Sequence, residues 1–276
     1  MRGIIAIAIT LVLSASGAMA AEVRVAVTTS FRDSGLSDVL LPAIAADTGL
    51  DVQLLVVGTG QALRIAAAGD VDAVLVHSRA AEKAFVAAGH GRHRRAIMFN
   101  DFVLIGPPDD PAGIGNATGV VDALARIAGA GATFVSRGDD SGTHKAELGL
   151  WEVAGTIPRG DWYREVGAGM GAAQNTASGL DAYLLSDRAS WLNFRNPGTL
   201  ALLFAGDPLL ANHYTYIPVD PARHGHVDAA AAARLEDWLT SDAARVLIDG
   251  YRIGGEQVFI FDAVARPSVR SGSATP

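Results

Sequence analysis

The chain contains no cysteine, and this absence excludes several kinds of site. Among the 276 residues there is no thiol that could form a disulfide, bind a metal as a thiolate or carry a lipid. Aromatic residues make up only 7% of the sequence and charged residues 18%, whereas hydrophobic residues make up 50%. This is the composition of an ordinary globular protein that is stabilised by its core alone.

Positive charge is also scarce. The sequence has 22 Lys and Arg against 29 Asp and Glu, which gives a formal net charge of −7 at pH 7. Nucleic acids and anionic membranes are bound through clustered Lys and Arg, so neither is expected as a partner. A small anionic ligand is still possible, because a buried site depends on its local donors and not on the screened net charge.

Long hydrophobic runs are absent after the N-terminus. Arg2 precedes an apolar stretch at residues 4–13, and small residues ending in Ala18-Met19-Ala20 follow. The stretch is too short to span a bilayer and is followed by an A-x-A cleavage pattern. We therefore expect residues 1–20 to be a cleaved signal peptide and the mature chain to be periplasmic, without insertion into the membrane.

From Val23 onward, strand-like and helix-like segments alternate, which predicts an α/β fold with parallel-rich sheets flanked by helices. The first series comprises strands at 23–27, 52–57 and 73–76, with helices at 34–47, 61–68 and 80–88. The second comprises strands at 102–105 and 133–136, helices at 143–154 and 170–186, strand-like runs near Trp191 and at 200–204, and helices at 229–239 and 242–249. The helix at 34–47 is expected to start at an Asp33 or Ser34 cap.

Proline divides the two series. The segment 107–111 contains three prolines, so it cannot continue as a central strand or enter a helix smoothly. We place a crossing between two lobes there and the return crossing at 214–219. The predicted division is 21–105 for the first part of lobe 1, 106–213 for lobe 2, 214–265 for the return to lobe 1, and 266–276 for a flexible tail. Two lobes joined by two crossings enclose a cleft, which can close around a ligand by a hinge motion.

Three loops rich in Gly, Ser and Thr lie where a predicted strand ends and a helix begins. Helix N-termini present unpaired N–H groups and the positive end of the helix dipole, so such loops suit anions. The predicted ligand-binding residues are Thr28, Thr29 and Ser30 in the first loop, Gly58, Thr59 and Gly60 in the second, and Arg137, Ser141, Gly142 and Thr143 in the third.

The third loop is the richest in donors. Arg137 adds a full charge and a planar fork that fits oxyanions. A desolvated dianion needs six or more converging donors, since each charge-assisted hydrogen bond contributes about 1.5–3 kcal/mol. Loops of both lobes can supply these donors together only in a closed cleft. Asp139, Asp140 and His144 are interpreted as supports of this loop.

These loops resemble a known family. The resemblance is carried by Val27-Thr28-Thr29-Ser30, Val57-Gly58-Thr59-Gly60-Gln61, Leu75-Val76-His77, Asn100-Asp101-Phe102-Val103, Arg137-Gly138-Asp139-Asp140-Ser141-Gly142-Thr143-His144, Tyr183 and Asp187-Arg188. With these segments, residues 25–261 resemble the tungstate-binding periplasmic proteins of bacterial ABC transporters, the TupA-like family.

The resemblance implies a two-lobed type II periplasmic binding fold with a hinged cleft. It also implies tungstate as the ligand, held by the Thr-Thr-Ser loop, the Gly-Thr-Gly loop, Arg137 and Thr143. The implied partner is a membrane permease with its ATPase. We expect no enzymatic activity, no cofactor, no bare metal ion and a monomeric chain.

Other ligands and one other class of protein stay open. Arg137, Asp139, Ser141 and Thr143 also match the R-x-D-x-S-G-T loop of phosphate-binding proteins, but protonated phosphate rewards a carboxylate acceptor, which the first-lobe loops lack at their contact positions. Molybdate, and less closely the smaller sulfate, are further alternatives that residue chemistry does not separate from tungstate. A serine hydrolase using Ser141 and His144 is disfavoured, because no G-x-S-x-G surrounds Ser141.

His224 and His226 form a second candidate site. They lie near Asp220 and Asp228 and could bind a metal. A His-x-His pair without an obvious third ligand is more simply a solvated loop, and this is the interpretation we adopt.

Overall fold

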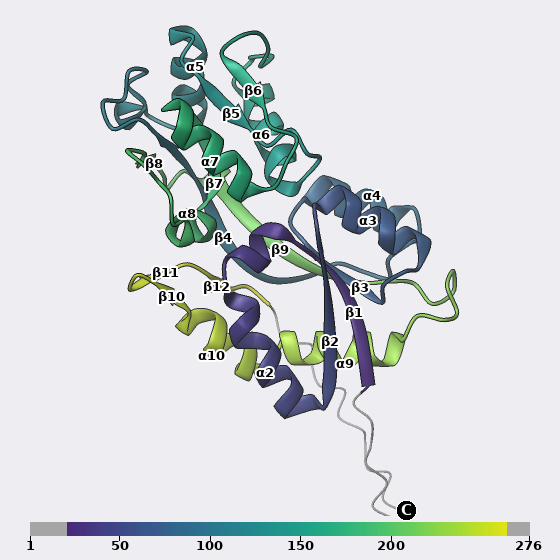
Figure 1. The fold of residues 1–276 in the computed structure, drawn as a ribbon. Helices are drawn as coiled ribbons and strands as arrows, with labels where there is room; N and C mark the ends of the chain where they lie inside the picture. The colour runs from purple at the N-terminus through teal and green to yellow at the C-terminus, as the bar shows by residue number, and fades with distance from the viewer. Residues whose placement is uncertain (1–20, 264–276) are drawn as a thin grey trace, which may run out of the picture.

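The computed structural model describes residues 21–263, so the predicted signal peptide and the predicted tail lie outside the described residues. Two bodies, each a sheet between helices, lie one above the other (Figure 1). Their sheets share one long strand, β4 (Arg95–Gly106). We term the body with β1 (Ala21–Thr28) the first lobe and the body with β5 (Phe134–Ser136) the second lobe. The predicted two-lobed α/β class is confirmed.

In the sheet of the first lobe, the strands on one side are parallel and those on the other side are antiparallel. Strands β2 (Leu50–Val57) and β3 (Ala73–Val76) flank β1 and run parallel to it. Strand β9 (Ala211–Pro218) runs antiparallel to both β3 and β4, and β12 (Ile260–Phe261) runs antiparallel to β4. Strands β9 and β12 are antiparallel because they return from the second lobe and are not built as strand-helix-strand units, and the predicted parallel-rich character of the sheet is confirmed.

The second lobe has the same mixed plan. Strand β5 pairs in parallel with β6 (Tyr163–Glu165) and β7 (Tyr183–Asp187). The second half of β4 pairs antiparallel with β7 and with β8 (Ala201–Phe204). In both lobes the parallel strands therefore end at the edge that faces the other lobe.

The outward crossing is made inside one continuous strand. Strand β4 pairs with β9 up to Asp101 and with β7 from Phe102, so it changes sheets before the proline-rich segment at 107–111. The chain returns between β8 and β9, ahead of 214–219. The residue bounds predicted for the lobes stay a prediction.

Ten helices cover the faces of the two sheets within the described range. They are α1 (Thr29–Asp33), α2 (Leu36–Thr48), α3 (Thr59–Ala68), α4 (Arg79–Ala87), α5 (Val120–Ala130), α6 (Gly142–Val153), α7 (Met170–Leu180), α8 (Arg188–Asn193), α9 (Ala229–Leu239) and α10 (Asp242–Gly250). Helices α3, α4, α6, α9 and α10 match the predicted ranges to within two residues, which is the ordinary uncertainty of helix ends.

Three predicted elements need correction. The helix predicted at 34–47 is preceded by the separate short helix α1 and starts after Gly35, whose positive φ of 79° provides the turn. The helix predicted at 170–186 ends at Leu180, and the left-handed Asp181 (φ 50°) leads into β7. The strand-like run near Trp191 is helix α8, because Asp187 caps a helix there by accepting from the Ser190 amide.

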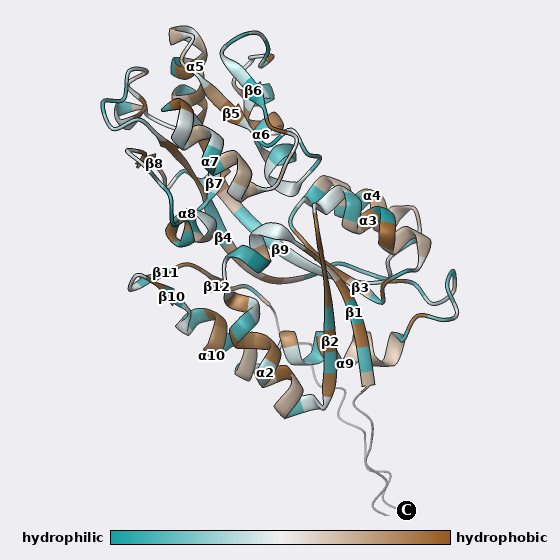
Figure 2. Ribbon diagram, viewed as in Figure 1, coloured by the Kyte–Doolittle hydropathy of each residue, from teal (hydrophilic) through white to brown (hydrophobic). Residues whose placement is uncertain are grey.

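The apolar residues form four cores, one on each face of each sheet. Alternate residues of β1 point to opposite faces: Val25 packs with α2 and α9, whereas Ala26 packs with α3. In β4, Leu104 packs with α5 and α6, and Ile105 packs with α7. Figure 2 shows the hydrophobic strands between the helices of each lobe. Because both faces of each sheet are covered, polar chemistry is concentrated at the ends of the strands.

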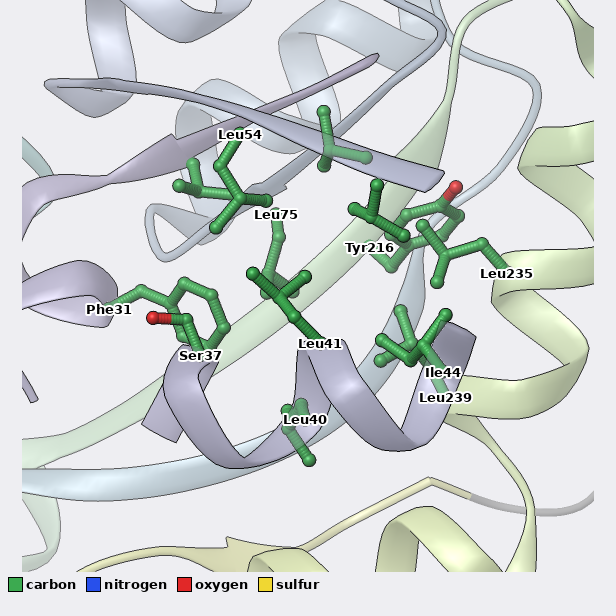
Figure 3. A pocket seen from close by; sticks show the side chains of 13 residues that line it. Phe31, Ser37, Leu40, Leu41, Ile44, Leu54, Leu75, Tyr216, Leu235 and Leu239 are labelled. Atoms are coloured by element: carbon green, nitrogen blue, oxygen red, sulfur yellow. The ribbon is translucent and has the colours of Figure 1, made fainter. Parts of the chain in front are cut away.

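A small apolar cavity lies in the core of the first lobe, between β1, β2 and α2 (Figure 3). Its volume is about 30 Å³, and its walls include Phe31, Leu40 and Ile44. The Ser37 hydroxyl lines it and has no hydrogen-bond partner among the described residues. This cavity lacks the donors that an anion requires, so it is not the candidate site.

Candidate functional site

Each of the three predicted loops ends a parallel strand and starts a helix. Thr28 caps α1 by accepting from the Phe31 amide at 3.3 Å, and Ser141 caps α6 by accepting from the His144 amide at 3.1 Å. Gly58 precedes α3 without a side-chain cap. Thr28 therefore serves as a helix cap, and the site's N–H donors come from three helix starts.

The structure brings the three loops together across the two lobes. The Gly60 amide donates to the Asp140 carbonyl at 3.3 Å, and Arg137 Nη2 donates to the Thr29 hydroxyl at 3.3 Å. A Cβ on Gly58 would lie 3.7 Å from the Cα of Ser141. The lobes are thus in contact around the predicted ligand-binding residues.

Two hydroxyls in this region have no partner. Thr59 and Thr143 are fully buried, at 0% exposure each, and neither Oγ1 makes a hydrogen bond to any described residue. They lie in the first turns of α3 and α6, on opposite lobes. A buried hydroxyl without a partner costs about 1–3 kcal/mol, so both suit a ligand that accepts hydrogen bonds.

Arg137 supplies the positive charge of the site. Its side chain is 2% exposed, and its Nε and Nη2 donate to Asp139 Oδ2 at 3.2 and 2.5 Å. No hydrogen bond from its Nη1 is found within the described residues. A buried guanidinium needs such a counterion, and the free Nη1 can still serve an anion.

The Ser30 hydroxyl is engaged inside the protein. It lies 3.1 Å from Thr28 Oγ1, 3.1 Å from His77 Nε2 and 3.3 Å from the Tyr214 hydroxyl. Ser30 can therefore offer an anion its backbone N–H more readily than its side chain. The Thr29 hydroxyl accepts from Arg137 and keeps its own proton available for donation.

His77 is a buried residue of the site for which we predict no role from the sequence. Burial, followed by the positive charge of Arg137, lowers its pKa to about 3, so the imidazole is neutral at physiological pH. Its ring lies beside that of Tyr214, with a centroid distance of 4.9 Å. The sequence signal that could have identified His77 as a site residue is its position directly after β3, the strand parallel to β1. Residues that follow neighbouring parallel strands lie at the same edge of the sheet.

Asp187 is the second residue without a predicted role. It is fully buried, its Oδ1 accepts from the Ser190 amide at 2.9 Å, and its Oδ2 has no partner among the described residues. Burial raises its pKa, and hydrogen bonds from Ser190 and the charge of Arg137 oppose that rise. The neutral form of such a carboxyl is a hydrogen-bond donor, so Asp187 need not repel an anion.

Of the three residues interpreted as supports of the third loop, Asp139 is the one that pairs with Arg137, whereas Asp140 pairs with other cations. Asp139 pairs with Arg137 and accepts from the Ser141 amide at 3.2 Å. Asp140 pairs with Lys145 and its amide donates to His144 Nδ1 at 3.3 Å. The His144 ring makes no hydrogen bond to the Ser141 hydroxyl, so the geometry of a serine hydrolase is missing from the described residues.

A buried carboxyl anchors the third loop from behind. Glu147 of α6 accepts from Ser136 at 2.8 Å, from Tyr163 at 2.7 Å and from Trp151 at 3.2 Å. Burial raises its pKa to about 7, although these three hydrogen bonds oppose the rise. Because Ser136 immediately precedes Arg137, this cluster fixes both ends of the loop.

The site opens to a groove between the lobes with a volume of about 990 Å³. His77 and Gly142 line both the groove and the meeting point of the loops, and Arg79 and Lys145 lie along its walls. Across residues 21–263 no group of three or more acidic or histidine side chains could hold a metal ion. None of the helices in that range is long and apolar enough to cross a membrane.

A two-lobed α/β fold whose strand-end loops meet between the lobes defines the class of periplasmic binding proteins. The family model described as a PBP superfamily domain matches residues 14–243, and the chain belongs to that superfamily. Within it, the chain belongs to the family of the TupA tungstate-binding proteins. It is 43% identical over 232 residues to the tungstate-binding protein TupA of Peptoclostridium acidaminophilum, covering 83% of this chain and 81% of that protein.

Two further comparisons agree with this family. A putative ABC transporter anion-binding protein of Haloferax volcanii is 44% identical over 249 residues, covering 88% of this chain and 73% of that protein. The crystal structure of the tungstate ABC transporter from Geobacter sulfurreducens has a TM-score of 0.77 and 44% identity, covering 83% of this chain and 98% of that one. The chain is therefore a binding protein of a transport family and not an enzyme.

Proposed function

We propose that this chain is a periplasmic receptor that captures tungstate between its lobes and delivers it to an ABC transporter permease with its ATPase. The observation that carries the proposal is the pair of buried, unpartnered hydroxyls of Thr59 and Thr143, one from each lobe, in the loops that meet beside Arg137. The names of the relatives favour tungstate among the anions that such donors accept. The signal peptide at residues 1–20 would export the chain as a soluble monomer.

Tungstate offers only acceptors, and the site offers mainly donors. We assign the ligand contacts to the ten predicted residues of the three loops: Thr28, Thr29, Ser30, Gly58, Thr59, Gly60, Arg137, Ser141, Gly142 and Thr143. The hydroxyls of Thr29, Thr59 and Thr143, the guanidinium and the helix N–H groups would surround the anion, while His77 and Tyr214 hold Ser30 in place. Hinge closure would complete this set, because no single lobe holds all the donors.

Phosphate is the alternative that the experiment must separate. Asp139 is a weak acceptor for a phosphate proton, because both of its oxygens already accept hydrogen bonds, one from the charged Arg137 and the other from the Ser141 amide. Asp187 has a free oxygen, but its raised pKa favours the neutral form, whose proton is a donor. Both facts favour a fully deprotonated anion such as tungstate or molybdate.

Calorimetric titration of residues 21–276 with tungstate, molybdate, sulfate and phosphate at pH 7 tests the proposal. We expect tight binding of tungstate, comparable or weaker binding of molybdate, and much weaker binding of the other two. As a matched pair, Thr143→Val should weaken tungstate binding, whereas Thr176→Val should not, because the Thr176 hydroxyl bonds to the Ala172 carbonyl on an exposed helix face. Tight phosphate binding without a tungstate signal would contradict the proposal.

A further inference from the structure

Glycines of the anion loops meet the opposite lobe. A Cβ on Gly60 would lie 1.8 Å from Asp140 Oδ2 and 2.6 Å from Asp140 Cγ. A Cβ on Gly142 would lie 2.6 Å from the His77 ring and 2.7 Å from the His77 carbonyl oxygen. All four distances are below the 3.0 Å that real Cβ contacts require, and at Gly60 the backbone oxygen of Asp140 also lies close, at 3.1 Å. These glycines therefore leave room for the other lobe, and not only for a ligand.

The contact at Gly60 is built from several interactions of one residue. Asp140 has a left-handed backbone, with φ 59°, which few non-glycine residues adopt. Its carbonyl accepts from the Gly60 amide at 3.3 Å, and its carboxylate pairs with Arg64 of α3 at 3.1 Å and with Lys145 of its own lobe. Hydrogen bonds and charge thus hold Asp140 of the second lobe against the start of α3 in the first.

We propose that the contact between Gly60 and Asp140 is a closure seat, which sets how far the lobes close and how long the bound anion is held. Asp140 acts here as a positioning residue, without touching the anion. This inference rests on the proposed function, since it concerns the retention of the same ligand.

The closure seat lies next to the donors of the site in the sequence. Thr59 immediately precedes Gly60, and Thr143 follows Asp140 by three residues. A displacement of about 1 Å at the seat would therefore separate the two unpartnered hydroxyls, and a hydrogen bond lengthened by that amount is lost. The seat couples the separation of the lobes directly to the donors of the site.

Gly60→Ala is the first test, measured by tungstate calorimetry and by small-angle scattering with and without tungstate. Gly60 lies in the first turn of α3 with an ordinary φ, so alanine should keep or raise the stability of the fold. The tungstate Kd should nevertheless rise by about tenfold or more, and the compaction on binding should be reduced. Gly149→Ala is the matched control, because a Cβ at Gly149 of α6 meets nothing within 4 Å.

Asp140→Gly completes a double-mutant cycle. Glycine suits the left-handed backbone and removes the carboxylate that fills the Cβ position of Gly60, leaving only the carbonyl oxygen at 3.1 Å. In this background Gly60→Ala should change the tungstate Kd by less than about threefold. The proposal would be wrong if Gly60→Ala raised the tungstate Kd equally in both backgrounds, or if it did not raise the Kd of the wild type. Failure of the wild-type chain to bind tungstate would instead contradict the proposed function.

Discussion

At the scale of single residues, the buried hydroxyls of the site have opposite effects on the stability of the protein and on its affinity for the ligand. Thr59 and Thr143 are buried like core residues, yet their Oγ1 atoms have no partner among the described residues. A hydroxyl in that condition destabilises the protein without ligand and strengthens its binding of an acceptor. Stability and affinity should therefore respond to its removal with opposite signs.

Thr143→Val tests this opposition. Without tungstate, the free energy of unfolding should stay equal or rise by about 1 kcal/mol, because valine has the same shape and no polar atom. The affinity for tungstate should fall by about tenfold, the equivalent of one lost charge-assisted hydrogen bond. Urea denaturation and calorimetry give the two quantities. Thr143→Ser keeps the hydroxyl and should keep most of the affinity, and a loss of stability in Thr143→Val would contradict the assignment.

Arg137 behaves differently, because its removal leaves neighbouring acidic groups without a positive charge. Asp139 lies against it, and its charge also acts on Asp33 and Asp187. Arg137→Gln should lower the free energy of unfolding by about 3 kcal/mol and should reduce tungstate affinity at least about a hundredfold. Arg137→Lys keeps the charge but not the fork, so it should keep most of the stability and recover only part of the affinity. Chemical denaturation and calorimetry at 15 °C check both variants, and unchanged binding would show that the site is misplaced.

The sequence predicts the loops better than it predicts their neighbours. Thr59 and Arg137 stand in loops whose composition alone indicates an anion site. His77 and Asp187 become parts of the site only because β3 and β7 end beside those loops. Their roles depend on contacts between distant segments, which no local pattern encodes.

At the scale of elements, helices with clear end signals are predictable and the central strands of the second lobe are less so. Helix α3 ends at Gly69 in the left-handed conformation, as expected from glycine at that position. The run at 182–185 looks like a continuation of α7 because all four of its residues are hydrophobic. It is strand β7, buried on both faces, and such strands lack the alternation that distinguishes strand from helix.

The His-x-His pair shows how an element can be held by a distant loop. His224 Nε2 lies 3.0 Å from the Ala67 carbonyl, and His226 Nε2 lies 2.9 Å from the Gly69 carbonyl. These contacts satisfy carbonyls at the C-terminus of α3, the helix that begins with Thr59. Most of this loop is exposed, as the solvated-loop interpretation expects, and its two rings are in addition bonded to the protein.

Asp187 gives a prediction for α8. Asp187→Ala removes its helix cap and should cost about 1 kcal/mol of unfolding free energy at pH 4 and less at pH 8, because it also removes the buried carboxyl whose pKa is raised. Asp187→Asn keeps an oxygen for the Ser190 amide. Since burial raises the pKa of Asp187, the wild type loses stability as pH rises above the ordinary carboxyl range, and the asparagine variant should be relatively more stable at pH 8. Urea denaturation at the two pH values checks this, and a pH-independent difference between Asn and wild type would contradict it.

At the scale of the whole molecule, the two lobes share β4, and each lobe contains at least one buried group with a shifted pKa. His77 lies in the first lobe and Glu147 in the second. The pKa of His77 falls from 6.5 to about 3, so its contribution to the free energy of unfolding is present above pH 6.5 and is lost as pH falls. The pKa of Glu147 rises from 4.5 to about 7, so its contribution is present below pH 4.5 and is lost as pH rises.

Between pH 4.5 and 6.5 these two slopes have opposite signs and nearly equal size, about 1.4 kcal/mol per pH unit each. These two contributions should cancel in the wild type, and each should become visible when the other group is replaced. Relative to the wild type, Glu147→Gln should become less stable as pH falls through this window, because the His77 contribution is no longer balanced by that of Glu147. His77→Asn should become less stable as pH rises, and the double variant should have the same pH dependence as the wild type. Urea denaturation without ligand at pH 4.5, 5.5 and 6.5 measures all four proteins, and single variants that follow the wild-type pH profile would show that neither group titrates as its burial requires.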